Sequence, residues 1–173
     1  MTFDRALLEQ LGKLPAAPWR GVVYRHMFAD YSPDRENTRG ARWNPPGAPA
    51  IYASVERALA LAEAEYQIGL QPVRPCVRRT VYRIAVTLGS ALDLTERAAL
   101  AGLGVGQAEL ESLDHAACQR VGAAVEWLGH DGLLVPSARG PGTNLVIFPN
   151  QQRADYEFKV IDAEVLPEEP PEA

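Results

Sequence analysis

Polar side chains that could contact a ligand are concentrated between residues 40 and 65. They are an arginine, an amide, an aromatic hydroxyl and a carboxylate, namely Arg42, Asn44, Tyr52 and Glu63. The surrounding pattern places them on a loop, on a short strand over residues 50–53 and on a helix over residues 55–69 that Ser54 would cap. Groups at the ends of a loop, a strand and a helix can converge on one cleft. The stretch therefore predicts one wall of a site for a polar ligand.

Side chains far from this stretch in sequence could complete the site. Arg25 lies in a predicted strand over residues 21–26, so it either faces solvent at the strand's end or points into a cleft towards an anion. Ser137 follows a proline at the end of another predicted strand, and no histidine–aspartate partners are visible for it. We therefore do not interpret it as a triad nucleophile. Asn144 could assist binding or hold a strand end.

The predicted helix carries two candidate carboxylates, Glu63 and Glu65. Residues two apart on a helix point about 200° away from each other, so the two glutamates cannot form a catalytic carboxylate pair. A solvated helix face is the usual alternative for either residue.

The composition excludes several classes of function. A formal net charge of −5 argues against a broad electrostatic grip on nucleic acid. Residues 3–14 form an amphipathic pattern that is unlike a signal peptide, and no apolar run approaches membrane-spanning length. We therefore expect a soluble cytoplasmic protein with no direct nucleic-acid binding and no membrane contact.

Cysteine and histidine spacing predicts no bound metal. Cys76 and Cys118 lie far apart and form no CxxC pair. The three histidines fit no ligand spacing, and we expect solvent or capping roles for His115 and His130.

The elements that would position these residues indicate an α+β domain with mainly antiparallel pairing. Helices are expected over residues 3–13, 55–69 and 115–130, and strands over residues 21–26, 50–53, 80–87, 91–94, 132–136, 144–148 and 156–161. The glycine-rich residues 102–106 are interpreted as a helix-to-helix connection because no nucleotide-loop motif surrounds them. We expect one domain over residues 1–162 and a disordered acidic, proline-rich tail over residues 163–173.

The order of these motifs resembles the RES-domain family, named for an arginine, a glutamate and a serine. The motifs are Tyr24-Arg25, Gly-Ala-Arg42-Trp-Asn-Pro-Pro-Gly, Ile-Tyr52-Ala-Ser, Ala-Leu-Ala-Glu63, Pro-Ser137-Ala-Arg and Asn144-Leu-Val-Ile-Phe. The resemblance covers about residues 19–161 and assigns the family arginine to Arg25, the glutamate to Glu63 and the serine to Ser137, with Glu65 as a competing register. The chain departs from the family at residues 27–39, which lack the usual glycine-rich entry to the pocket.

The resemblance implies an ADP-ribosyltransferase-like fold with a split, mainly antiparallel sheet around an NAD⁺ cleft. It implies the toxin half of a toxin–antitoxin pair, partnered by an Xre-type DNA-binding antitoxin from a neighbouring gene, with a homo-oligomer expected within that complex. The expected activity is cleavage of the nicotinamide–ribose bond of NAD⁺, which depletes it. Two alternatives stay open: an ADP-ribosyltransferase that modifies a cellular metabolic enzyme, and a catalytically inactive partner-binding module.

The same resemblance implies a role for each side chain. Glu63 would stabilise the positive charge that develops on the ribose, and Arg25 and Arg42 would bind the pyrophosphate. Tyr52 would stack on nicotinamide or on its ribose, while Ser137 and Asn144 would anchor ribose or the nicotinamide amide. Glu63, Arg25 and Tyr52 are the expected catalytic residues.

Overall fold

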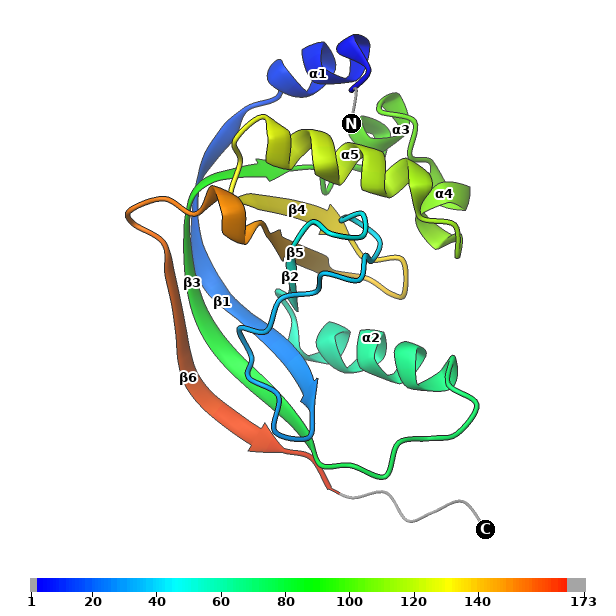
Figure 1. Cartoon of the computed structure of the whole chain (residues 1–173), viewed down its shortest axis with the longest axis vertical. Coiled ribbons are helices and arrows are strands. Elements are labelled where there is room, and N and C mark those ends of the chain that lie inside the picture. Colours follow the sequence, from blue (N-terminus) through cyan, green and yellow to red (C-terminus); the bar gives the residue numbers. More distant parts are fainter. Residues whose placement is uncertain (1–2, 168–173) are drawn as a thin grey trace.

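The computed structural model describes residues 3–167. Helices and strands follow each other along the chain without a regular alternation (Figure 1). In order, the elements are α1 (Arg5–Gly12), β1 (Ala16–Phe28), β2 (Ile51–Ser54), α2 (Arg57–Gly69), β3 (Arg79–Asp93), α3 (Arg97–Gly102), α4 (Gln107–Glu111), α5 (Ala116–Trp127), β4 (Gly132–Pro136), β5 (Thr143–Ile147), the 3₁₀ helix η1 (Pro149–Gln151) and β6 (Glu157–Val165).

The strands pair in the order β1-β2-β5-β4-β3-β6, and a further pairing of β1 with β3 closes the first five into a ring. Only β3 and β4 run parallel among the described strands; the other pairs are antiparallel. Figure 1 shows α1, α3, α4 and α5 gathered at one end of the sheet and α2 apart from them beside β1. The predicted α+β class with mainly antiparallel pairing is confirmed.

β1 and β3 are much longer than the sequence predicts, and they are the two longest strands of the sheet. They pair from Ala16 opposite Leu92 to Phe28 opposite Arg79. Residues 80–87 and 91–94 were expected as separate strands, but β3 runs through Gly89 and Ser90. The carboxylate of the fully buried Asp131 accepts the N–H groups of both residues at 2.8 Å. The β1–β3 register shifts at this point and leaves Gly89 and Ser90 without a partner on β1, so the side chain just before β4 accepts their N–H groups instead.

The helices agree with the predicted pattern, but the predicted cap of α2 is wrong. α2 begins at Arg57 after Glu56, and it ends at Gly69 as expected. Ser54 does not cap it, because its hydroxyl donates instead to Oδ1 of Asn144 at 2.7 Å. The glycine-rich connection lies between α3 and α4, as expected.

The C-terminal strand extends beyond the predicted end of the domain. β6 continues to Val165, which pairs with Thr80, so the expected boundary at residue 162 falls inside a strand. The remainder of the predicted acidic tail, from residue 168, lies outside the described residues. Over residues 3–167, no helix is both long and apolar enough to cross a bilayer.

A long loop over residues 29–49 connects β1 to β2 and is fastened to the helical end of the molecule (Figure 1). Trp43 is 3% exposed and packs in the same core cluster as Val121 and Val125 of α5. The amide of Gln119 donates to the Ala41 carbonyl at 2.9 Å. Gly122 lets the two segments approach, because a Cβ there would lie 1.9 Å from the Trp43 carbonyl oxygen. The packing of α5 therefore fixes this loop.

Replacing Gly122 with alanine tests that close approach. A methyl group cannot fit against backbone atoms without displacing them, so we expect Gly122→Ala to lower the free energy of unfolding by about 1–3 kcal/mol. Thermal unfolding would show this as a drop of about 2–4 °C per kcal/mol. Gly102→Ala is the matched control, because a Cβ there meets no atom within 4 Å. Equal midpoints for the two variants would contradict the packing argument.

Candidate active site

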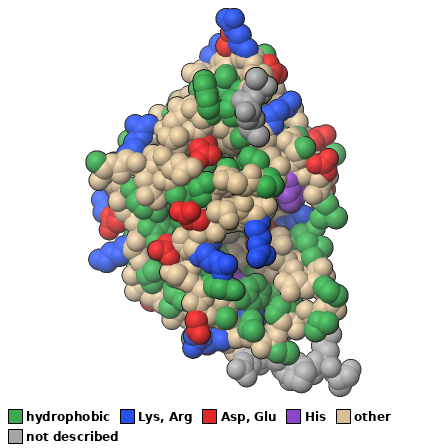
Figure 2. All heavy atoms as spheres, viewed as in Figure 1, with side chains coloured by type: hydrophobic (Ala, Val, Ile, Leu, Met, Phe, Trp, Pro, Cys, Tyr) green, Lys and Arg blue, Asp and Glu red, His purple; other side chains and the backbone are tan. Residues whose placement is uncertain are grey.

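A cavity of about 480 Å³ opens between β1, β2, α2 and the loop over residues 29–49. Its size is that of a site for a small organic ligand. In Figure 2 the face in view is hollowed near its middle, and basic side chains gather beside the hollow. Five of the six predicted site residues line the cavity, namely Arg25, Arg42, Tyr52, Glu63 and Asn144. Ser137 is 2% exposed and lies behind the cavity wall.

Glu63 is held in one orientation by two hydrogen bonds to the same oxygen. The Ser137 hydroxyl donates to Oε1 at 2.7 Å, and the Asn144 amide donates to Oε1 at 2.8 Å. Within residues 3–167, no donor reaches Oε2. One carboxylate oxygen is therefore fixed by the protein, and the other is left for a ligand.

Neighbouring groups fix the two donors in turn. The backbone N–H of Arg139 donates to the Ser137 hydroxyl at 2.9 Å, so that hydroxyl directs its own proton to Glu63. A carboxylate can only accept, which requires the nitrogen of Asn144 to face Glu63 and its oxygen to face Ser54. The result is a chain of polar contacts from β2 through β5 to α2.

Tyr52 contributes its ring to the cavity while its hydroxyl holds the loop. The hydroxyl donates to Oδ1 of Asn44 at 2.6 Å and accepts from the Trp43 N–H at 3.0 Å. Burial raises the pKa of Tyr52, so the phenol keeps its proton. The amide of Asn44, which is buried, continues the network to the carbonyls of Asn37 and Ala48.

Arg25 and Arg42 line the cavity, and both also donate hydrogen bonds to backbone carbonyls. Arg25 donates to the carbonyls of Pro33 at 2.7 Å and Arg35 at 2.6 Å. Burial lowers the pKa of Arg25 to about 10, so it is still a cation at neutral pH. Arg42 donates to the carbonyls of Leu110 and Ser112. The strand-end alternative for Arg25, with the side chain in solvent, is wrong.

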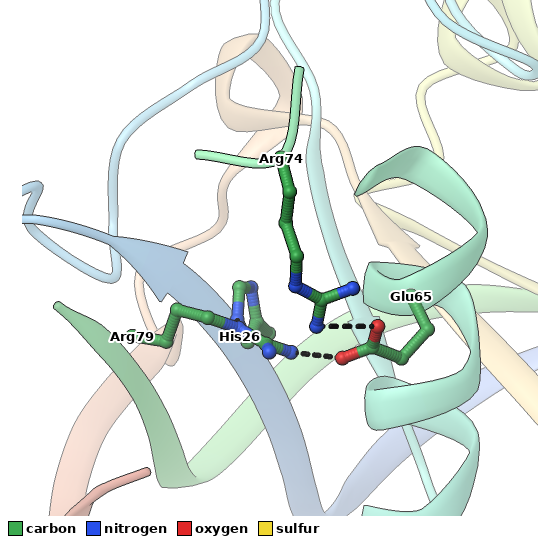
Figure 3. A network of polar contacts seen from close by, with 4 residues as sticks. All are labelled: His26, Glu65, Arg74 and Arg79. Carbon is green, nitrogen blue, oxygen red and sulfur yellow. Dashed lines mark hydrogen bonds and ion pairs between the residues drawn. The ribbon is translucent and has the colours of Figure 1, made fainter. Parts of the chain in front are cut away.

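Glu65 forms ion pairs with two arginines (Figure 3). Its carboxylate contacts Arg79 and, at 3.1 Å, Arg74, and it is not among the cavity-lining residues. Arg79 also donates to Nε2 of His26 at 3.0 Å. The geometry therefore favours Glu63 over Glu65 as the carboxylate of the site.

Sequence reasoning gave no site role to several polar residues that line the cavity, among them His26, His115 and Arg139. His115 lies at the start of α5 without a side-chain cap bond, and its side chain lines the cavity instead of serving the expected capping or solvent role. Arg139 also lines the cavity, and its guanidinium lies 3.5 Å above the Tyr66 ring. Both follow irregular segments, where no periodicity indicates which way a side chain points.

No group of three or more histidine, cysteine, aspartate or glutamate side chains that could hold a metal ion occurs in the described part of the chain.

An α+β fold with a cavity that holds an anchored carboxylate defines the class as a small ligand-binding or enzyme domain. A sequence model of the RES domain matches residues 17–167. The chain therefore belongs to the RES-domain family, as the motif order predicts. It is 30% identical over 158 residues to the NAD(+) phosphorylase MbcT of Mycobacterium tuberculosis, covering 87% of this chain and 84% of that protein. The Mycobacterium bovis MbcT matches equally. The crystal structure of the M. tuberculosis MbcT–MbcA toxin–antitoxin complex superimposes with a TM-score of 0.85 at 26% identity, covering 95% of this chain and 94% of that one.

The partly buried contact between His26 and Arg79 predicts acid sensitivity. Burial, and then the charge of Arg79, lower the pKa of His26 to about 4 in the folded chain, whereas an unfolded histidine titrates near 6.5. Between these values the unfolded state binds the additional proton, so stability falls as the pH drops from about 6.5 towards about 4. Thermal midpoints measured across this range should fall less steeply in His26→Gln than in the parent. Parallel curves would contradict the assignment.

Proposed function

We propose that this chain cleaves the nicotinamide–ribose bond of NAD⁺ and acts as the toxin of a toxin–antitoxin pair. The observation that carries the proposal is the Glu63 carboxylate, which is fixed through one oxygen and open at the other inside a ligand-sized cavity. The family membership and the name of the mycobacterial relative, NAD(+) phosphorylase, support the same chemistry.

The chemistry requires a positioned negative charge more than a strong nucleophile. When the bond breaks, its electron pair goes to the nicotinamide nitrogen, which becomes neutral, and positive charge develops on the ribose carbon. The free oxygen of Glu63 would stabilise this oxocarbenium-like centre and bind the ribose hydroxyls. No proton has to reach the leaving group.

Ser137 and Asn144 act through Glu63 in this proposal. Both donate to Oε1, so they orient the carboxylate before the substrate arrives and avoid reorganisation in the transition state. This role differs from the expected one, in which Ser137 and Asn144 anchor the ribose or the nicotinamide amide. The buried position of Ser137 favours the positioning role.

Arg25 and Arg42 would attract the pyrophosphate mainly by their charge. Their carbonyl partners accept hydrogen bonds but carry no net charge, so both guanidiniums remain cations that face the cavity. Tyr52, with its hydroxyl engaged, offers only its ring to nicotinamide or ribose.

Inorganic phosphate is the acceptor that the relative's name favours. One of its oxygens would bond to the ribose carbon that nicotinamide leaves, giving ADP-ribose phosphorylated at that carbon. Water or a protein side chain could take the same place, which defines the hydrolase and ADP-ribosyltransferase alternatives.

A DNA-binding antitoxin of the Xre type, encoded by a neighbouring gene, is the proposed partner, with assembly into a larger complex in the cytoplasm. The structural similarity to the toxin of a toxin–antitoxin complex supports an antitoxin partner. We also propose that the fold is related to that of ADP-ribosyltransferases, on the strength of the family resemblance and of the mainly antiparallel sheet beside the cavity.

Removing the charge of Glu63 tests the site. We expect Glu63→Gln to slow nicotinamide release from NAD⁺ by about 10²–10³-fold, as loss of other preorganised electrostatic contacts does. Glu65→Gln is the control on the same helix, and it should stay within about threefold of the parent because its ion pairs are partly exposed. Full activity of Glu63→Gln would contradict the assignment of Glu63 to the active site. A parent protein that does not cleave NAD⁺ would favour the alternative of a catalytically inactive partner-binding module.

The acceptor can be identified by varying phosphate. We expect nicotinamide release to accelerate with inorganic phosphate and the product to carry one phosphate more than ADP-ribose, as seen by mass spectrometry. A rate independent of phosphate with free ADP-ribose as product would indicate hydrolysis. Label transferred from NAD⁺ to a protein in a cell extract would indicate ADP-ribosylation.

A further inference from the structure

The cavity has the opposite charge to the protein that surrounds it. The chain carries a formal net charge of −5, yet the described residues that line the cavity include three arginines and a single carboxylate, Glu63. The arginines are Arg25, Arg42 and Arg139. A concave site with this balance focuses positive potential and favours an anionic ligand.

Arg139 differs from the other two arginines in its hydrogen bonds. Arg25 and Arg42 donate to backbone carbonyls, but Nη2 of Arg139 is buried and has no hydrogen-bond partner in the described part of the chain. The stack on Tyr66, at 3.5 Å, holds the guanidinium in place without supplying an acceptor. A buried charged donor without an acceptor is costly, and a ligand oxygen would remove that cost.

The position of Arg139 ties it to the reacting end of the cavity. Its backbone N–H donates to the Ser137 hydroxyl, which donates to Glu63. Arg42 and His115 line the cavity with it. Burial, then the charges of Arg42 and Arg139, lower the pKa of His115. His115 therefore lies in a cavity wall that also carries two cations, Arg42 and Arg139.

We propose that Arg139, with Arg42 and His115 beside it, forms a subsite that binds a phosphate group next to Glu63. This deepens the function proposed above and rests on it. The fork of Arg139 suits phosphate oxygens. Two sources share this chemistry, the inorganic phosphate that attacks the ribose and the pyrophosphate of NAD⁺, and kinetics separate them.

The test measures the KM for each phosphate source in Arg139→Ala and Arg139→Lys. We expect Arg139→Ala to raise one of the two KM values by about 10- to 100-fold, the loss expected for a charge-assisted contact. A change in the KM for inorganic phosphate identifies the acceptor, and a change in the KM for NAD⁺ identifies the pyrophosphate. Arg139→Lys should recover part of the loss, because it keeps the charge but not the fork.

Arg83→Ala is the matched control. It removes the same charge from an ion pair with Asp162 on the sheet surface, away from the cavity. Thermal midpoints check that each variant is folded. Both KM values within twofold of the parent in a folded Arg139 variant, or an equal rise in Arg83→Ala, would overturn the proposal.

A binding measurement separates this proposal from the function on which it rests. Calorimetric titration with ADP-ribose and with inorganic phosphate reports the subsite without turnover. Weaker binding of either probe to Arg139→Ala, in a parent protein that releases no nicotinamide, would reject NAD⁺ cleavage but retain the phosphate subsite. Unchanged binding of both probes, in a parent protein that does cleave NAD⁺, would reject the subsite alone.

Discussion

The hydrogen bonds that fix one oxygen of Glu63 are the constraint on which the rest of the site depends. They join three parts of the chain that are distant in sequence: α2, the turn after β4 and the start of β5. β5 pairs with both β2 and β4, so the ring of strands sets the distance between Asn144 and Ser137. A carboxylate restrained in this way has little freedom to lose when a substrate binds, which is the structural meaning of preorganisation.

The remaining polar residues of the cavity hold the protein together as well as facing the ligand. Arg25, Arg42 and Tyr52 each bind the loop over residues 29–49 or the segment after α4. Backbone carbonyls satisfy the guanidinium N–H groups without cancelling their charge, so structural use and electrostatic use are compatible. An acidic protein can thus keep a positively charged cavity, because Glu63 is the single carboxylate among the described residues that line it.

Much of the fold and the location of the site follow from sequence, and the failures have local causes. Periodicity predicted α2, α5 and the strands that line the cavity. The order of short motifs predicted that Arg25, Glu63 and Ser137 belong to one region. β3 was divided in the prediction because no sequence pattern shows that Asp131 would accept the N–H groups of Gly89 and Ser90. Arg139 and His115 were missed because the directions of side chains at a loop and at a helix start depend on tertiary packing.

The attachment of the loop to cavity side chains affects how genetic data on this protein should be interpreted. If the chain is the proposed toxin, a selection for loss of growth inhibition would recover substitutions of Arg25 and Tyr52 whether these residues contact substrate or only hold the loop. It would also recover substitutions of Gly122, which does not line the cavity but sets where the loop lies. Inactivating mutations would therefore include residues that hold the cavity in shape as well as residues that contact the substrate. Activity measurements on purified, folded variants are needed to tell these two groups apart.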